Sequence, residues 1–255
     1  MNRREKTTAI RQLLRGGMPS IGSWIQIPHP SIAEILGRSG YDWVAADMEH
    51  GAIGAHHLPD LFRALELGGT LPMARLAHGE PKDCKQALDA GAGGVIVPMV
   101  ESAQQLERVR DACRWPPAGT RGVGFSRANL FGADFDAYAQ EAQAPLLIAM
   151  IEHVRAVEKL GEILAVDGLD GILIGPYDLS ASMGATGEFH VPEFTAAMER
   201  IRNACRVSGK PCGIHVVQPD PAQLAQRIAE GYRFLAYSMD SMFLRASAIN
   251  PQGAS

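Results

Sequence analysis

The chain has 255 residues, of which 46% are hydrophobic, and this composition supports one large core or two small ones. Its 24 basic and 28 acidic residues give a net charge of −4 without any basic run, which argues against a nucleic-acid partner. No hydrophobic stretch reaches membrane-spanning length, the polar N-terminus is not a secretory signal, and the cysteines lack metal-ligand spacing, so we expect a cytoplasmic protein with no membrane partner.

Short hydrophobic runs alternate with helical patterns along the chain. After an amphipathic N-terminal helix, strands are predicted at residues 20–28, 41–51, 71–76, 93–100, from Leu146, from Gly171, and at 211–217 and 234–240. Helices are predicted at residues 31–38, 57–67, 81–89, 102–113, 192–207 and 221–230, with one more after Leu146. Buried strands that alternate with helices indicate a parallel sheet. Eight such units predict an α/β protein with a single (β/α)8 TIM barrel domain over residues 1–255. A doubly wound sheet is the alternative, although no glycine-rich dinucleotide turn follows an early strand.

Residues 115–145 break this rhythm, because the segment is too long for an ordinary connection. Its glycines at 119, 122 and 124 could suggest a phosphate cradle, but no strand precedes them and no Lys-Ser/Thr pair follows. We therefore predict a surface or interface loop that carries Arg121 and Arg127.

The stretch 146–184 predicts a strand, a helix and a second strand, and each strand is followed by a carboxylate, Glu152 or Asp178. Strands joined by such a crossover run parallel, so both carboxylates emerge at the same edge of the sheet. Neighbouring strands lie about 4.8 Å apart, which lets one hard cation take an oxygen from each at roughly 2.0–2.1 Å. Each acid alone could instead be a helix-capping charge. The pair, with the stiff turn at Gly175 and Pro176, favours a metal site.

Polar residues also follow the other predicted strands, at the end where barrel enzymes place their active sites. They are Asp47, Glu49, His50, Arg75, His215 and Asp240. A lone histidine at a strand end is more often structural than catalytic. Arg75 requires a carboxylate or an anionic ligand, because burying an unpaired guanidinium is very costly.

Asp89 lies in the last turn of a predicted helix, where the helix dipole disfavours negative charge. This placement indicates a role such as orienting a histidine, or else an exposed residue without a role. The lysines fall in helices or before strands, so none is placed to form a Schiff base: Lys6, Lys82, Lys85, Lys159 and Lys210. Carbonyl chemistry would therefore need a metal as electron sink.

Five motifs occur in a familiar order between about Ile21 and Asp240: WVAADMEHG, the Arg75 strand, ALDAGAGGVIVPMV, MIE and GILIGPYDLSASMG. They resemble the HpcH/HpaI aldolase family, metal-dependent pyruvate aldolases of the phosphoenolpyruvate/pyruvate barrel superfamily. The resemblance implies a class II aldolase that cleaves or forms 4-hydroxy-2-oxo acids, with pyruvate or a close 2-oxo acid as donor and an aldehyde as acceptor. A CoA-ester lyase of the citrate lyase or malyl-CoA type shares the barrel, but the chain lacks a basic patch for the CoA phosphates. A decarboxylating or Diels–Alder-like relative would look similar, and a non-catalytic binding protein would need a damaged site.

By the same resemblance, Glu152 and Asp178 bind a divalent cation, Mg2+, Mn2+ or Co2+. His50 is the general base and pairs with Asp89. Arg75 binds the 2-oxo acid and steadies its enolate oxygen. The family is commonly hexameric and exchanges its last helix between subunits, which the apolar stretch SMFLRASAI fits.

The remaining substrate contacts implied by the resemblance come from the backbone around Gly175 to Tyr177, which would hold the substrate carboxylate next to Asp178. The chain departs from the family at Met150, where many members have Gln, and at His215, where many have Leu. We expect His215 to face the barrel mouth beside the aldehyde and to ionise near pH ~6.5.

Overall fold

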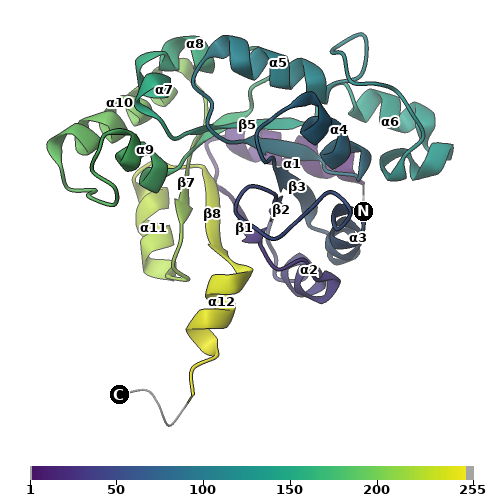
Figure 1. Ribbon diagram of the computed structural model, residues 1–255, viewed down its shortest axis with the longest axis horizontal. Coiled ribbons are helices and arrows are strands. Elements are labelled where there is room, and N and C mark those ends of the chain that lie inside the picture. The colour runs from purple at the N-terminus through teal and green to yellow at the C-terminus, as the bar shows by residue number, and fades with distance from the viewer. Residues whose placement is uncertain (1, 251–255) are drawn as a thin grey trace.

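The computed structural model describes residues 2–250, which fold into one closed barrel of eight parallel strands surrounded by helices (Figure 1). The strands are β1 (Ser20–Ile25), β2 (Trp43–Asp47), β3 (Leu71–Arg75), β4 (Gly94–Val97), β5 (Leu146–Ile151), β6 (Gly171–Ile174), β7 (Cys212–Val216) and β8 (Phe234–Met239). The helices are α1 (Arg3–Arg15), α2 (Pro30–Gly37), α3 (Leu58–Gly68), α4 (Pro81–Asp89), α5 (Ala103–Cys113), α6 (Phe135–Glu141), α7 (Val154–Glu158), α8 (Leu160–Leu164), α9 (Pro176–Ser182), α10 (Pro192–Ser208), α11 (Pro221–Ala229) and α12 (Asp240–Ser247). The predicted (β/α)8 fold is confirmed.

Large side chains fill the barrel, so the interior is a packed core. Trp43 stacks on Phe234 with ring centroids 4.4 Å apart. A Cβ at Gly22 would lie 2.1 Å from the Trp43 ring, so only glycine leaves room for the indole. Ile10 and Leu14 of α1 join this inner cluster, and α1 thereby closes the N-terminal end of the barrel. The opposite end remains available for a site.

Several strands end earlier than predicted, and the polar residues that follow them lie on turns. β2 ends at Asp47 because its Oδ1 accepts the backbone N–H groups of Glu49 and His50, both at 3.1 Å. Beyond β4, Met99 has a φ of 50° in the left-handed region, which is uncommon for a residue other than glycine. These turns place side chains over the barrel mouth.

The segment after α5, predicted as a surface or interface loop, is exposed at residues 122–125 but is ordered beyond them. It contains a short 3-10 helix, η1 (Arg127–Gly132), and α6. A small separate core holds it together, made of Trp115, Ala128, Tyr138 and Ala142. Arg121 is only 3% exposed, and Arg127 donates to the Ala90 carbonyl at 2.7 Å and pairs with Glu66. Both arginines are therefore structural anchors, because their charges meet partners on α3 and α4 that lie far away in the sequence.

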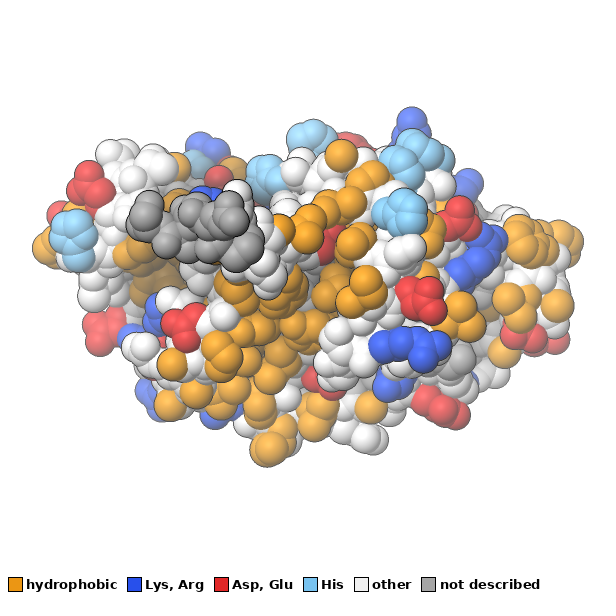
Figure 2. All heavy atoms as spheres, turned by 90° about the horizontal axis from the view of Figure 1, so that it is seen from below, with side chains coloured by type: hydrophobic (Ala, Val, Ile, Leu, Met, Phe, Trp, Pro, Cys, Tyr) orange, Lys and Arg blue, Asp and Glu red, His pale blue; other side chains and the backbone are white. Residues whose placement is uncertain are grey.

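The last helix, α12, projects beyond the barrel (Figure 1). It carries exposed apolar side chains such as Leu244, which is 57% exposed. Figure 2 shows hydrophobic side chains gathered across the middle of the face seen from below. Within residues 2–250, no helix is long and apolar enough to cross a membrane.

Candidate active site

A cavity of about 800 Å³ opens at the C-terminal ends of the strands. Most of the residues predicted for the site line it, namely His50, Arg75, Met150, Glu152, Gly175, Tyr177, Asp178 and His215. Asp89 does not. The closure of the barrel brings these residues together, although His50 and His215 are 165 positions apart in the sequence.

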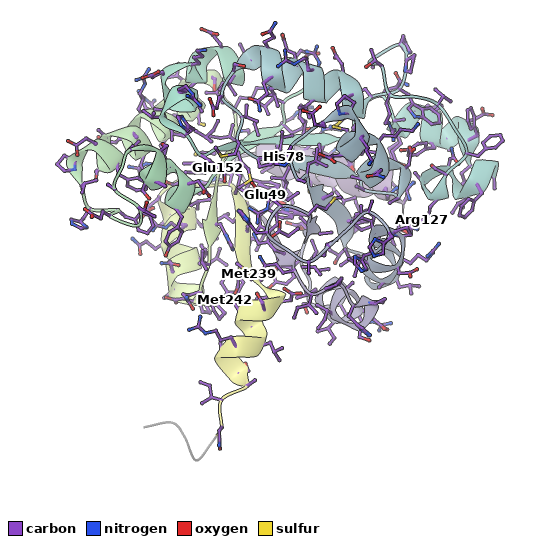
Figure 3. The ribbon with its side chains drawn as sticks, in the orientation of Figure 1. Glu49, His78, Arg127, Glu152, Met239 and Met242 are labelled. Atoms are coloured by element: carbon purple, nitrogen blue, oxygen red, sulfur yellow. The ribbon has the colours of Figure 1, made fainter. Side chains whose placement is uncertain are left out.

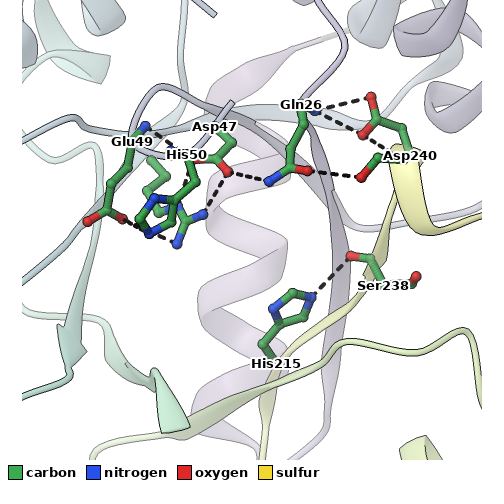
Figure 4. A network of polar contacts seen from close by, with 9 residues as sticks. Gln26, Asp47, Glu49, His50, His215, Ser238 and Asp240 are labelled. Atoms are coloured by element: carbon green, nitrogen blue, oxygen red, sulfur yellow. Dashed lines mark hydrogen bonds and ion pairs between the residues drawn. The ribbon is translucent and has the colours of Figure 1, made fainter. Parts of the chain in front are cut away.

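Arg75 is held rigidly by Asp47, its neighbour in the register of β2 and β3. Its Nε donates to Asp47 Oδ1 at 2.9 Å and its Nη2 to Oδ2 at 2.7 Å (Figure 4). Burial alone would raise the pKa of Asp47, but the hydrogen bonds and charge of Arg75 hold it below its usual value. The guanidinium also lies 4.8 Å from the Trp24 ring centroid. A guanidinium has five N–H donors and Asp47 takes two, so three remain for Glu49 and a ligand.

Gln26 extends this network and was missed in the sequence. Its Nε2 donates to Asp47 Oδ2 at 3.0 Å, and its Oε1 accepts from Ser241 Oγ at 2.9 Å (Figure 4). Asp240 accepts the backbone N–H groups of Gln26 and Ile27, at distances of 2.9 to 3.1 Å. Asp240 therefore ties the end of β1 to the start of α12 and has no free oxygen for a metal. The only sequence signal for Gln26 is a polar residue directly after a buried strand.

Glu152 brings an almost fully buried carboxylate to the cavity, since the residue is only 2% exposed. Its Oε2 accepts one hydrogen bond, from the Met99 N–H at 2.9 Å. Burial raises its pKa to about 7, and the nearby negative charges of Glu49 and Asp178 add to the effect. Figure 3 places Glu49 and Glu152 at the centre of the barrel mouth. A Cβ at Gly175 would lie 2.3 Å from Glu152 Oε1, so this glycine leaves room for the carboxylate.

These carboxylates fit a divalent cation. Glu152 and Asp178 are oxygen donors of the type that hard cations prefer, and they lie in one cavity with too little positive charge around them. Glu49 already has a cationic partner, since its Oε2 lies 3.2 Å from Arg75 Nη1. Among residues 2–250, no group of three or more histidine, cysteine or acidic side chains is arranged to hold a metal. Such a site would rely on two protein ligands and leave its other positions to substrate and water.

The predicted pairing of His50 with Asp89 is wrong within this chain. His50 lies at the barrel mouth with a side chain that is 57% exposed, and its Nε2 is 3.8 Å from Glu49 Oε2. Asp89 ends α4, and the helices of a barrel run back against the strands, so it lies at the opposite end. There Arg121 Nη1 donates to Asp89 Oδ1 at 3.0 Å. The ion pair with the buried Arg121 thus compensates for the unfavourable interaction between the Asp89 charge and the dipole of its helix.

His215 lines the cavity, as predicted, but its pKa is lower than the expected value of ~6.5. Its Nε2 lies 3.3 Å from the Ser238 carbonyl oxygen (Figure 4). Its ring centroid lies 5.8 Å from that of Trp24, in an edge-to-face arrangement. Burial lowers its pKa to about 4, and the charge of Arg75 acts in the same direction. His215 is therefore neutral at physiological pH. With Nε2 donating to the carbonyl, Nδ1 becomes an acceptor toward the cavity.

Comparison with known proteins finds relatives over nearly the whole chain. The sequence model of the family described as HpcH/HpaI aldolase/citrate lyase matches residues 20–247. The hydroxypyruvate/pyruvate aldolase of Roseobacter denitrificans is 38% identical over 237 residues, covering 92% of this chain and 91% of that protein. The 2-keto-3-deoxy-L-rhamnonate aldolase of Shigella boydii is 37% identical over 238 residues, covering 92% and 88%. A crystal structure of an HpcH/HpaI aldolase/citrate lyase family protein from Burkholderia cenocepacia superposes with a TM-score of 0.88 at 34% identity, covering 95% and 96%.

Proposed function

The chain belongs to the HpcH/HpaI aldolase/citrate lyase family, and from this premise we propose that it is a metal-dependent class II aldolase acting on 4-hydroxy-2-oxo acids. Pyruvate or a close 2-oxo acid is the donor and an aldehyde is the acceptor. The relatives named as aldolases of hydroxypyruvate, pyruvate and a 2-keto-3-deoxy sugar acid support this substrate class. We place the enzyme in the cytoplasm.

Glu152 and Asp178 would hold the divalent cation, Mg2+, Mn2+ or Co2+. A bound cation supplies a Lewis acid that stabilises negative charge on the keto oxygen of the substrate. The buried Glu152 and the glycine beside it support this assignment, because a carboxylate with a single hydrogen-bond donor needs a further positive partner.

Arg75 donates hydrogen bonds to the oxygen on which negative charge develops as the enolate forms. Asp47 and Gln26 fix the guanidinium beforehand, so little reorganisation is needed during the reaction. His50 moves the proton at the methyl carbon of the 2-oxo acid, for which its exposed position at the mouth leaves room. The backbone around Gly175 to Tyr177 holds the substrate carboxylate, next to Asp178.

One observation carries this proposal: Arg75, Glu152 and Asp178 line a single cavity at the mouth of the barrel. The test is a screen of 4-hydroxy-2-oxo acids in which released pyruvate is measured with lactate dehydrogenase, with and without EDTA. We expect cleavage that EDTA abolishes and added divalent metal restores. Full activity in metal-free enzyme would exclude a class II mechanism.

We also propose a hexamer in which subunits exchange α12. Its projection from the barrel and the exposed Leu244 support this arrangement (Figure 1). Light scattering of the full chain, compared with a Leu244→Asp variant, measures the assembly directly.

A further inference from the structure

The turn that follows β4 supplies a hydrogen bond to Glu152. The register of the sheet pairs Val97 of β4 with Ala149 of β5. Had β4 continued, Met99 would lie opposite Ile151, the last residue of β5. Instead, the chain turns and Met99 donates its backbone N–H to Glu152 Oε2 at 2.9 Å, at the centre of the barrel mouth (Figure 3). The direction of this N–H therefore helps to set the position of a proposed metal ligand.

Met99 makes this turn in an unfavourable backbone conformation. Its φ of 50° lies in the left-handed region, where a Cβ crowds the following carbonyl oxygen. Glycine takes up the same conformation readily. In any other residue it persists only where the surrounding structure holds it. Contacts from outside Met99 must therefore stabilise the turn.

Gln105 makes such contacts from the first turn of α5. Its Nε2 donates to the Met99 carbonyl oxygen at 3.0 Å, and its Oε1 accepts the Glu101 N–H at 2.8 Å. The side chain thus bonds to the backbone on both sides of Val100 and closes the turn. Ser102, the N-cap of α5, accepts the Gln105 N–H at 3.2 Å and fixes where the glutamine lies.

These bonds differ from ordinary helix capping. In a capping box the side chain of the third helical residue accepts the backbone N–H of the N-cap, and glutamate serves as well as glutamine. Gln105 is the third residue of α5, but it accepts from the residue before the N-cap and also donates to Met99. A carboxylate could make the first bond but not the second, because it has no donor. The amide of Gln105 therefore matches the turn as well as the helix.

A second link joins the turn to α7, but it is weak. Arg155 Nη2 donates to Glu101 Oε1 at 2.9 Å, and α7 begins two residues after Glu152. The Arg155 side chain is 59% exposed. Exposed ion pairs contribute little to stability. Gln105 is therefore the main side-chain support of the turn.

We propose that Gln105 is a positioning residue for metal binding. It holds Met99 in the left-handed conformation, so that the Met99 N–H orients the carboxylate of Glu152 before a divalent cation binds. Residues that orient metal ligands commonly change metal affinity by about 10- to 100-fold when they are substituted. This inference rests on the proposed aldolase function, in which Glu152 is a metal ligand.

The test measures the Kd for Mn2+ by isothermal titration calorimetry of the full chain without substrate. Gln105→Ala should weaken Mn2+ binding by roughly 10-fold, the lower end of that range, because its bond to Met99 is exposed to solvent. The number of sites per chain should not change. Gln104→Ala, at an exposed position of the same helix, is the matched control and should bind Mn2+ as tightly as the wild type.

Substitutions at Met99 separate this role from support of α5. In a Met99→Gly background, Gln105→Ala should weaken Mn2+ binding much less, because glycine adopts the left-handed conformation without help. In a Met99→Ala background it should weaken binding as strongly as in the wild type, because alanine keeps the Cβ. Equal losses in both backgrounds would make Gln105 a support of the helix alone. The proposal is also overturned if Gln105→Ala leaves the Kd unchanged, whether or not it reduces the number of sites.

The Glu152→Gln variant tests the proposed function in the same assay. If the wild type does not bind Mn2+, or if Glu152→Gln binds it as tightly, the metal site and the class II assignment fail. If Glu152→Gln loses Mn2+ binding while Gln105→Ala keeps the wild-type Kd, only the positioning role of Gln105 fails.

Discussion

The two sides of the active-site cavity balance their charges in opposite ways. On the arginine side, formed by Gln26, Asp47 and Arg75, each charged group has a hydrogen-bonded partner within the chain. On the carboxylate side, formed by Glu152 and Asp178, Glu152 accepts one backbone N–H, and the negative charges of Glu49 and Asp178 act on it more strongly than the positive charge of Arg75. The first side is complete before substrate arrives, whereas the second needs a cation. The groups that orient a substrate thus have their charges neutralised by partners within the chain. The groups proposed to bind a metal lack such partners.

Removing a charge from the carboxylate side should give the largest loss of activity. Glu152→Gln should lower aldol cleavage by more than about 10³-fold, because a metal contributes several kcal/mol to the transition state.

The same variant should change how stability depends on pH. The pKa of Glu152 is raised to about 7, which means that its ionisation opposes folding. That group's stabilising contribution is present below pH ~4.5 and is lost as pH rises through about 7. In EDTA at pH ~8, urea unfolding should therefore show the variant to be more stable by up to about 3 kcal/mol. Glu158→Gln, at an exposed position of α7, is the control. A destabilised Glu152→Gln protein would contradict the comparison.

His50 lies at the mouth between the two sides and does not neutralise the charged groups of either side. His50→Ala should slow proton exchange at the pyruvate methyl group by about 10²–10⁴-fold, the usual range for a general base. Its thermal stability should stay near that of the wild type, since the side chain is 57% exposed. His56→Ala, an exposed neighbour, is the matched control. Exchange at the wild-type rate would assign the base to another group.

On the arginine side, a substitution should lower both activity and stability, whereas Glu152→Gln should lower activity and raise stability. Arg75→Lys keeps the charge but cannot hold Asp47 through two parallel hydrogen bonds. We expect turnover to fall by roughly 10- to 100-fold and unfolding to occur at lower urea concentration. Arg63→Lys, in an exposed pair with Asp60, tests the same exchange at the surface. Lower stability with normal turnover would make Arg75 a structural residue alone.

His215 should show the smallest effect on rate and a distinct dependence on pH. Because its pKa is lowered to about 4, the wild-type protein should lose stability as pH falls from ~6.5 through about 4, by up to about 3 kcal/mol. His215→Leu should lack this loss in urea unfolding followed across that range. Because Nδ1 is an acceptor, we expect the wild-type enzyme to prefer hydroxylated over alkyl aldehydes. His215→Leu should reduce this preference by about fivefold and leave pyruvate proton exchange intact. An unchanged aldehyde profile would assign His215 to the structure of the barrel.

The sequence by itself determined the barrel and the end of it that carries the site. Hydrophobic periodicity depends on neighbouring residues, so eight strands and the carboxylates after two of them could be recognised without coordinates. The need of Arg75 for a carboxylate or an anionic ligand was also readable, because a buried guanidinium cannot stay unpaired. These features depend on local pattern and on general costs of burial.

Only the tertiary structure decided which groups meet. Asp47 rather than a ligand holds Arg75, and Asp89 pairs with Arg121 at the far end of the barrel instead of with His50. The neutral state of His215 likewise depends on residues distant in the chain. Pairing, desolvation and cavity shape are set by contacts between elements, and strand periodicity specifies the face and end of each element but not its partner across the barrel.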